Sequence, residues 1–230
     1  MRILHLSATN ILATANGQEE MERRSRTMQS LASGGTSIDF MTNSTGPLSI
    51  ETAEDEQAAV PGLKVNLASA KGYDAITLGC FGDPGLSELK ELTPLPVLGP
   101  GISALHAASL ISSRFSVLAP VRSSIPSTER QIRDYGCSAK GASVRALDIP
   151  VLTIRQDRAR AVDAAVRAAG ECIEKDGAEA IVLGCMSMAF LRMDLDLAEV
   201  LGVTVINPLI PLVRFAETLA LISAKGESKQ

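Results

Sequence analysis

The chain has 230 residues, of which 46% are hydrophobic, 21% charged and 3% aromatic. Such a composition supports a hydrophobic core and excludes the disordered and collagen-like classes. The 22 basic and 26 acidic residues give a net charge of -4 without a long run of one sign, which argues against nucleic acid or an anionic membrane surface as a partner. We therefore expect one domain or two small ones that handle a small molecule.

The sequence also bears on location and cysteine chemistry. No apolar run approaches the roughly 18 residues of a membrane span, and Ser7 interrupts the opening apolar run too early for a secretory signal. This pattern predicts a cytoplasmic protein. The four cysteines show no CxxC spacing and the two histidines are not clustered, so we expect neither a disulfide scaffold nor a metal site.

Strand and helix patterns alternate along the chain. Strands are expected at residues 1–6, 37–41, 74–78, 96–98, 115–119, 143–147, 179–183 and 203–206. Helices are expected at residues 21–31, in the stretch that ends at Ala70, at 103–112, 127–135 and 158–175, and in a short helix begun by Pro84. This alternation predicts an α/β fold with mostly parallel sheets that helices cover on both faces.

An internal repeat places two cysteines in matching positions. Residues 72–80 align with residues 177–185 at an offset of 105, and six of the nine positions are identical. The similarity continues where residues 98–100, Leu-Gly-Pro, are answered by residues 206–208, Ile-Asn-Pro. The simplest explanation is the duplication of an α/β half.

In each copy, Cys80 or Cys185 follows a glycine at the carboxyl end of a predicted strand, where open α/β sheets bind ligands. The N–H groups and dipole of a following helix would lower the thiol pKa from its free value of about 8.5. The alternative is that each cysteine is a small buried hydrophobic residue, kept in both copies for packing. Cys137 and Cys172 lack this setting, and we expect both to be structural.

Two facing halves would bring both thiols to one cleft, where proton transfer suits them better than disulfide exchange. A thiolate would remove a proton from one face of a carbon acid, and the second thiol would protonate the opposite face, which inverts the configuration. Backbone N–H groups at helix ends could stabilise the enolate formed on the way.

Residues 78–85, Leu-Gly-Cys-Phe-Gly-Asp-Pro-Gly, and residues 183–188, Leu-Gly-Cys-Met-Ser-Met, resemble the hydantoin racemase branch of the aspartate/glutamate racemase superfamily. Residues 46–51 and parts of 114–146 are also similar, so the resemblance covers nearly the whole chain. It implies two pseudo-symmetric α/β lobes, one of residues 1–98 plus 207–230 and the other of residues 99–206. The last helix, at about 208–222, would return to the first lobe.

The resemblance further implies a cofactor-independent racemase or epimerase whose site lies between the lobes, with Cys80 and Cys185 as acid and base, and a homo-oligomeric assembly. The expected substrate is a 5-substituted hydantoin or a related cyclic ureide. Alternatives are a related isomerase or racemase acting on allantoin, an amino acid or a dicarboxylic acid, or a binding protein without catalysis.

Several positions depart from the pattern of that branch. Residues 7–10, Ser-Ala-Thr-Asn, stand where relatives have an Asn-Pro-Asn-Thr loop, and Ile102 stands where an acidic residue is frequent. Ala119, Pro120 and Ser123 replace a Thr-Thr pair with a nearby arginine. These changes remove polar groups where substrate would be bound, so the preferred acyl substrate or the rate could differ.

Candidate substrate-binding residues are assigned from their positions in the loops: Ser7, Thr9, Asn10, Asn43, Ser44, Phe81, Gly82, Met186, Ser187 and Asn207. Simple turn chemistry is the alternative for Asn43 and Ser44, and core packing is the alternative for Met186. We expect Asp83 to cap the helix that comes after it and not to touch substrate.

A weaker pattern indicates another class of enzyme. Residues 99–104, Gly-Pro-Gly-Ile-Ser-Ala, match a dinucleotide-binding fingerprint between a strand and a helix. The acidic residue expected about 20 positions later is absent. His5 and His106 are interpreted as packed core histidines.

Overall fold

The computed structural model describes the backbone of residues 1–227 and the side chains of residues 1–224. The chain divides into two compact units. Unit 1 comprises Met1–Ile50, Glu54–Pro100 and the chain from Leu209 onward, and unit 2 comprises Glu51–Ala53 and Gly101–Pro208.

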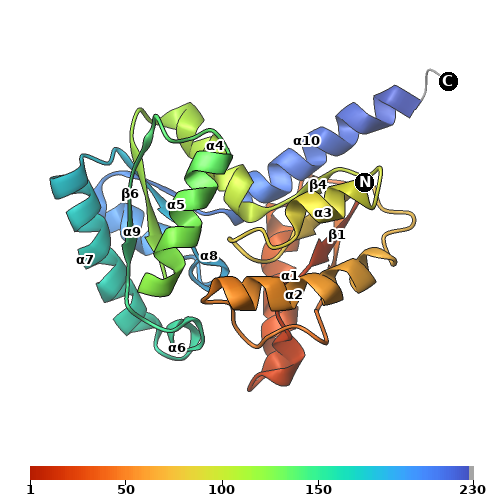
Figure 1. Ribbon diagram of the computed structural model, residues 1–230, viewed down its shortest axis with the longest axis horizontal. Coiled ribbons are helices and arrows are strands. Elements are labelled where there is room, and N and C mark those ends of the chain that lie inside the picture. Colours follow the sequence, from red (N-terminus) through yellow and green to blue (C-terminus); the bar gives the residue numbers. More distant parts are fainter. Residues whose placement is uncertain (228–230) are drawn as a thin grey trace. The chain divides into compact units, whose positions relative to one another are not determined.

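Unit 1 contains a four-stranded parallel sheet in the order β2-β1-β3-β4. The strands are β1 (Arg2–Leu6), β2 (Ser37–Met41), β3 (Ala75–Leu78) and β4 (Val97–Leu98). Its helices are α1 (Gly17–Leu31), α2 (Ala53–Leu67), α3 (Leu86–Glu91) and α10 (Leu209–Glu227). Helices α1 and α10 contact each other and the sheet, while α2 and α3 lie on its other face (Figure 1).

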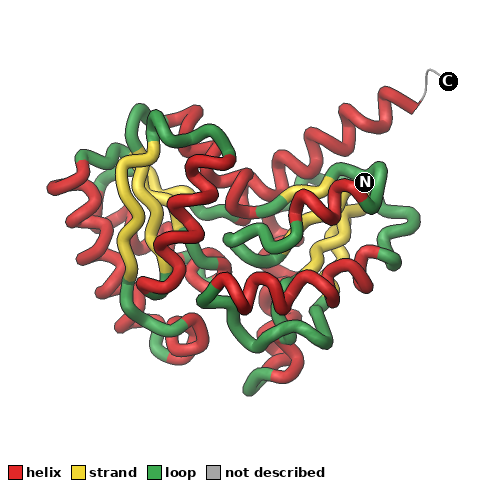
Figure 2. The backbone as a smooth tube through the Cα atoms, in the orientation of Figure 1, coloured by secondary structure: helices red, strands yellow, loops and turns green. Residues whose placement is uncertain are grey.

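Unit 2 repeats this arrangement with a parallel sheet in the order β6-β5-β7-β8. The strands are β5 (Phe115–Ala119), β6 (Gly141–Ala146), β7 (Ala180–Leu183) and β8 (Thr204–Ile206). The helices are α4 (Pro100–Ile111), α5 (Ile125–Asp134), α6 (Val151–Gln156), α7 (Arg158–Asp176), α8 (Met186–Phe190) and α9 (Met193–Leu201). Figure 2 shows the strands of each unit flanked by helices.

The two sheets share one strand order, so β1 corresponds to β5 and β3 to β7. The predicted α/β class, with duplicated halves built on parallel sheets, is confirmed. Strands buried on both faces are mostly apolar, and the fully buried Ala180–Leu183 is apolar throughout. The duplication therefore places the residue after β3 and the residue after β7 in equivalent positions.

Helix α7 shows how local sequence sets the core of unit 2. It begins where the Asp157 carboxylate accepts a hydrogen bond from the N–H of Arg160 (3.1 Å), and it ends at Gly177, whose φ is 70°. Between these ends, Ala161, Ala165 and Ala169 repeat every four residues and are fully buried, so the helix approaches the sheet closely. Their small side chains complete an apolar cluster with strands β5 and β7.

Cys137 and Cys172, the two cysteines interpreted as structural, are both buried in unit 2. Cys172 is fully buried in the cluster under α7, and this burial raises the pKa of its thiol. Cys137 is 4% exposed and accepts a hydrogen bond from the Ser109 hydroxyl (3.5 Å). None of the four cysteines, all of which lie in the described part of the chain, forms a disulfide.

Some local expectations were wrong. Helices α6 and α9 were not predicted, because they are short, with six and nine residues, and give a weak periodic pattern. The short helix α3 begins at Leu86, not at Pro84. The residue before it is Gly85, which has a φ of 68°. A right-handed helix cannot continue through this left-handed conformation, so the helix starts only after Gly85.

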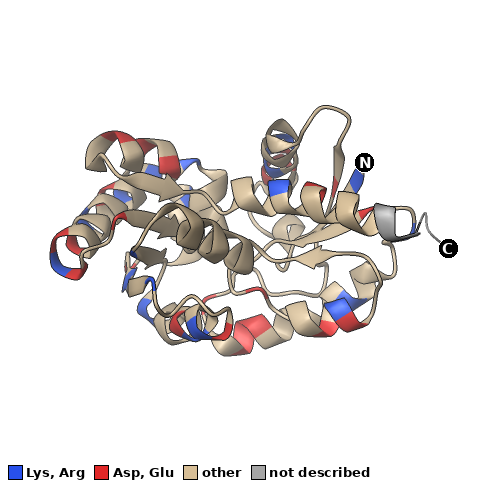
Figure 3. Cartoon of the chain, turned by 90° about the horizontal axis from the view of Figure 1, so that it is seen from above, with Lys and Arg blue, Asp and Glu red and all other residues tan. Residues whose placement is uncertain are grey.

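Charged side chains lie mostly on the helices, where Figure 3 shows basic and acidic residues close together. One example is the pair formed by Lys175 and Glu171 at 3.0 Å. Within residues 1–227, no helix combines the length and the apolar character needed to cross a membrane. The described side chains contain no group of three or more His, Cys, Asp and Glu residues placed to hold a metal ion.

A buried carboxylate joins α10 to the chain just after α1. Glu217 is 7% exposed, and its carboxylate accepts hydrogen bonds from the N–H (2.7 Å) and hydroxyl (2.8 Å) of Ser33. Burial alone would raise the pKa of Glu217, but hydrogen bonds from Ser33, Thr36 and Arg214 outweigh it and hold this pKa below its usual value of 4.5. The charged form of Glu217 therefore stabilises the folded state.

We expect Glu217→Gln to destabilise the protein by about 1–2 kcal/mol at pH 7, because an amide replaces the charged acceptor. Since the folded pKa lies below 4.5, this stabilisation is complete above pH 4.5 and is lost as the pH falls through the folded value. Urea unfolding of both proteins at several pH values from 7 down to about 2 would show the difference narrowing below pH 4.5. A difference that stays constant over this range would contradict the assignment.

Candidate active site

Cys80 lies in a turn just past the end of β3. The preceding Gly79 donates its N–H to the carbonyl of Leu6 (2.8 Å), which extends the ladder between β3 and β1 by one residue. A Cβ on Gly79 would lie 2.8 Å from the Cα of Ser7 and 2.9 Å from Nε2 of His5, so only glycine fits here. Cys80 itself is partly exposed.

Cys185 occupies the equivalent place in unit 2, one residue past Gly184 and the end of β7. Gly184 donates its N–H to the carbonyl of Leu118 (2.8 Å), and a Cβ there would lie 2.7 Å from the same oxygen. Cys185 is 6% exposed and is the N-cap residue of α8. Each unit thus presents one thiol after an obligatory glycine at the carboxyl edge of its sheet.

The chain takes a different course after each of the two cysteines. Helix α8 begins immediately after Cys185, as expected. After Cys80 the chain first forms a turn, in which the N–H of Asp83 donates to the carbonyl of Cys80 (3.0 Å), and α3 begins only at Leu86. The expectation that a helix begins directly after both cysteines was therefore wrong for Cys80.

The loop after β1 is held by its own polar side chains. Ser7 is 1% exposed, and its hydroxyl donates to the carbonyl of Thr9 (3.1 Å). The amide of Asn10 donates to the carbonyl of Ser44 in the loop after β2 (2.8 Å). Ser7 and Asn10 thus shape the loop, whereas Thr9 is partly exposed and Ser44 is exposed.

Asn43 is fully buried and its amide is used by the protein. Its Nδ2 donates to the carbonyls of Ala8 (3.2 Å) and Ala59 (2.9 Å), and its Oδ1 accepts from the N–H (3.3 Å) and hydroxyl (3.2 Å) of Thr45. These bonds tie the loops after β1 and β2 to helix α2. The contacts favour the turn interpretation of Asn43 over direct substrate binding.

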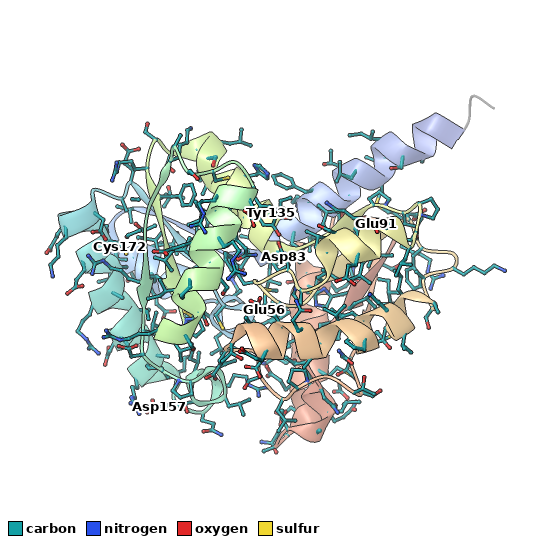
Figure 4. All side chains as sticks on the ribbon, in the orientation of Figure 1. Glu56, Asp83, Glu91, Tyr135, Asp157 and Cys172 are labelled. Atoms are coloured by element: carbon teal, nitrogen blue, oxygen red, sulfur yellow. The ribbon has the colours of Figure 1, made fainter. Side chains whose placement is uncertain are left out.

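Two carboxylates border the turn that carries Cys80, and Figure 4 labels both. Glu56 on α2 packs against Gly82, where a Cβ would lie 2.3 Å from its Oε1. Asp83 is 5% exposed, has a φ of 50°, and places its carboxylate 2.1 Å from the position of a Cβ on Gly99. Glu56 was missed by sequence analysis because nothing distinguishes it from its acidic neighbours.

The prediction that Asp83 caps the next helix was wrong. The N-cap residue of α3 is Gly85, which has no side chain to cap the helix. The Asp83 carboxylate instead fills the space beside Gly99, which precedes α4. A pyrophosphate would need that space in a dinucleotide site, and the carboxylate would repel it. The glycine pattern at residues 99–104 therefore serves packing.

Of the predicted binding residues beside the two cysteines, Gly82 is partly exposed and the other three are buried. Met186 is 5% and Ser187 4% exposed, while Phe81 in unit 1 is 4% exposed. Asn207 is 1% exposed, and its Nδ2 donates to the carbonyl of Ala189 (2.9 Å) and to Asp194 (2.7 Å). Asn207 thus holds α8 and α9 in place, and Asp194 is a further residue that sequence analysis did not identify.

The two histidines differ. His5 is fully buried in β1 and its Nδ1 lies 3.0 Å from the Thr77 hydroxyl, as expected of a core histidine. Burial, with the nearby charge of Arg24, lowers the pKa of His5 to about 3, so the ring is neutral near pH 7. His106 is exposed on α4, so its interpretation as a packed core residue was wrong.

Comparison with known proteins agrees with this arrangement. Residues 10–216 match the family model described as Asp/Glu/Hydantoin racemase. The chain is 39% identical over 175 residues to a hydantoin racemase of Rhizobium meliloti, covering 75% of this chain and 72% of that protein. It is 31% identical over 227 residues to a hydantoin racemase of Pseudomonas sp. (strain NS671), covering 98% and 88%.

A solved structure is similar over nearly the same length. The crystal structure of allantoin racemase from Pseudomonas fluorescens aligns with a TM-score of 0.89 and 28% sequence identity, covering 96% of this chain and 92% of that one. The family model and the Pseudomonas sp. relative both extend over Cys80 and Cys185. The chain belongs to the Asp/Glu/hydantoin racemase family, in its hydantoin racemase branch, and is an isomerase of the racemase class.

Proposed function

We propose that the protein is a cofactor-independent racemase of a 5-substituted hydantoin or a related cyclic ureide, with Cys80 and Cys185 as its two bases. The observation that carries this proposal is their equivalence. Each thiol comes after a glycine that tolerates no side chain, at the carboxyl end of the corresponding strand of a duplicated unit. Packing alone does not require a thiol at both places.

The proposed reaction is a proton transfer at the carbon next to a ring carbonyl. One cysteine thiolate takes the proton of C5 and becomes a thiol, while the electron pair passes into the carbonyl to form an enolate. The other thiol gives its proton to the opposite face of C5 and becomes the thiolate. The product is the other enantiomer, and the reverse reaction starts from the exchanged protonation states of the two cysteines.

We favour a neutral cyclic ureide over a free amino acid or a dicarboxylic acid as the substrate. The hydantoin racemases among the relatives support the same class.

Allantoin is the second candidate substrate. The solved structure with a TM-score of 0.89 to this chain is an allantoin racemase. Allantoin carries the same ring as a hydantoin with a polar ureido group at C5, so the chemistry at the carbon would be unchanged. The two candidate substrates differ only in the substituent at C5. An alkyl group there would need apolar protein groups around it, whereas the ureido group of allantoin would need hydrogen-bonding groups.

We propose two roles for the candidate binding residues. The substrate contacts are assigned to Thr9 and Ser44 in the first two loops and to the residues beside each cysteine, which are Phe81, Gly82, Met186 and Ser187. The amides of Asn10, Asn43 and Asn207 and the Ser7 hydroxyl keep the loops in place, because the protein already uses their hydrogen bonds. The buried Phe81 and Met186 favour apolar substituents on C5.

The test is proton NMR in D2O with single enantiomers of several 5-alkylhydantoins, allantoin, aspartate and glutamate, read together with optical rotation. Loss of the C5 proton signal together with loss of rotation is expected for hydantoins, after subtraction of the spontaneous exchange in an enzyme-free sample. Faster turnover of allantoin than of any alkylhydantoin would favour the second candidate. Turnover of aspartate or glutamate alone would overturn the proposed substrate class.

The proposal also includes the cellular setting and the assembly. Four cysteines without a disulfide suit a reducing compartment, in agreement with the predicted cytoplasmic location. The homo-oligomer implied by the family resemblance is tested by light scattering on the eluting protein, which gives the mass relative to the 24.2 kDa chain.

A further inference from the structure

The residues beneath the two cysteines occupy the same positions but differ in chemistry. In unit 2, Val117 on β5 pairs with Val182 on β7, and Cγ1 of Val117 lies 2.8 Å from where a Cβ of Gly184 would be. In unit 1, the equivalent pair is His5 and Thr77, and Nε2 of His5 lies 2.9 Å from where a Cβ of Gly79 would be. An imidazole and a hydroxyl thus replace two valines.

This replacement is unfavourable for folding. His5 is fully buried, and its Nε2 has no hydrogen-bond partner in the described structure. A buried polar atom without a partner destabilises a protein, whereas unit 2 shows that two valines fill the same place in the same strand pairing. Polar groups that weaken a core are expected where function requires them.

The imidazole also has a defined orientation. Nδ1 lies 3.0 Å from the Thr77 hydroxyl, and the ring packs on Phe40 with centroids 4.6 Å apart. Nε2 stands at the far end of this ring, whereas Cγ1 of Val117 is attached directly to Cβ. The side chain of residue 5 or 117 comes equally close to the Cβ position of the glycine that precedes the cysteine in its unit. In unit 1 it is therefore the longer His5 side chain that supports the Gly79 turn.

We propose that His5, held by Thr77, is a positioning residue for Cys80: its ring supports the Gly79–Cys80 turn and sets where the thiol of Cys80 meets the substrate. This inference rests on the proposed function. It makes the two bases unequal, since the glycine before Cys80 packs on a polar pair and the glycine before Cys185 packs on a valine pair. A small displacement of a catalytic group is sufficient to slow a reaction markedly.

The first test transfers the pair of unit 2 into unit 1. The double variant His5→Val, Thr77→Val should fold, as its urea midpoint would check, because the removal of two buried polar groups offsets the space left by the shorter side chain at residue 5. Its racemisation rate should fall about tenfold. The matched control is Ile3→Val, a mild change in the same buried strand, whose rate should stay within about twofold. Unchanged racemisation by the double variant would overturn the proposal.

The second test separates the two bases. In a Cys185→Ser background, only Cys80 can exchange the C5 proton of a hydantoin with D2O, and the valine pair should slow this exchange about tenfold. In a Cys80→Ser background, the exchange by Cys185 should change less than about twofold. Equal losses in both backgrounds would indicate general structural damage and would contradict the proposal. His5→Gln, which keeps length and a polar end, should restore most of the exchange.

A third measurement does not depend on the substrate. The rate of Cys80 alkylation by iodoacetamide, followed by peptide mass spectrometry, should rise about threefold or more in the valine pair as the turn loosens, while alkylation of Cys185 is unchanged. The wild type could fail to exchange the proton of any tested carbon acid with D2O and still show slower Cys80 alkylation than the valine pair. The proposed function would then fail, while the support of Cys80 by His5 would stand. An unchanged Cys80 rate would overturn the support itself.

Discussion

Replacing either Cys80 or Cys185 by serine is expected to lower racemisation of a 5-alkylhydantoin by roughly 10³-fold or more. A serine hydroxyl is far less acidic than a thiol and supplies neither the thiolate nor the proton donor at neutral pH. The rate is measured by optical rotation with each enantiomer as the starting material. Loss is expected in both directions, because every inversion uses both groups.

The single-cysteine variants should also reveal which face each base serves. Each should still exchange the C5 proton of one enantiomer with D2O without inverting it, and the two variants should select opposite enantiomers. Cys137→Ser is the matched control, since Cys137 is a buried thiol that follows neither β3 nor β7 and already contacts the Ser109 hydroxyl. The two-base mechanism would be wrong if Cys185→Ser still racemised both enantiomers at the full rate.

Asn43→Leu is expected to destabilise the protein by about 3 kcal/mol, because leucine has a similar shape but leaves buried backbone groups without their partners. The lost bonds are those to the carbonyls of Ala8 and Ala59 and those from Thr45. Gly62 on α2 adds a packing constraint, since its Cβ would lie 1.8 Å from Oδ1 of Asn43. The side chain at residue 43 therefore has little freedom to move.

The free energy of unfolding in urea measures this effect, and Asn66→Leu is the matched control. Asn66 is less buried and its amide makes one bond, to the carbonyl of Thr42 (3.0 Å), so we expect a loss of about 1 kcal/mol. A loss for Asn43→Leu no larger than that of the control would show that its amide does not hold the two loops. Retained stability with a raised KM would instead return Asn43 to the substrate-binding residues.

Much of the fold could be predicted because it depends on local patterns. The strands 37–41 and 115–119 were predicted with the bounds that the structure has: the first alternates polar and apolar residues, and the second is a short, mostly apolar run. The repeat of Gly79–Cys80 in Gly184–Cys185 predicted the equivalence of the two halves. The polarity pattern of a strand and the repeated Gly-Cys sequence each depend on residues adjacent in the chain, so both can be recognised without knowledge of the packing.

The surroundings of the cysteines could not be predicted in the same way. Asp83 has the sequence position of a helix cap, yet its φ of 50° turns the carboxylate to Gly99 instead. Glu56 lies 24 residues before Cys80 in the chain and reaches the Cys80 turn only through the packing of α2. Asn207 has the sequence position of a loop amide for substrate, but its hydrogen bonds go to Ala189 and Asp194.

The sequence by itself determined the α/β class, the duplication, the presence of a Gly-Cys pair in each half and the racemase family, because each can be recognised from short segments of adjacent residues. Only the tertiary structure decided which polar side chains are used inside the protein. It showed that the Asn43 amide is fully bonded and that Nε2 of His5 is buried without a partner beside Gly79, within the described residues. Hydrogen bonds and close contacts between distant residues depend on how strands and helices pack, and no local pattern specifies that packing.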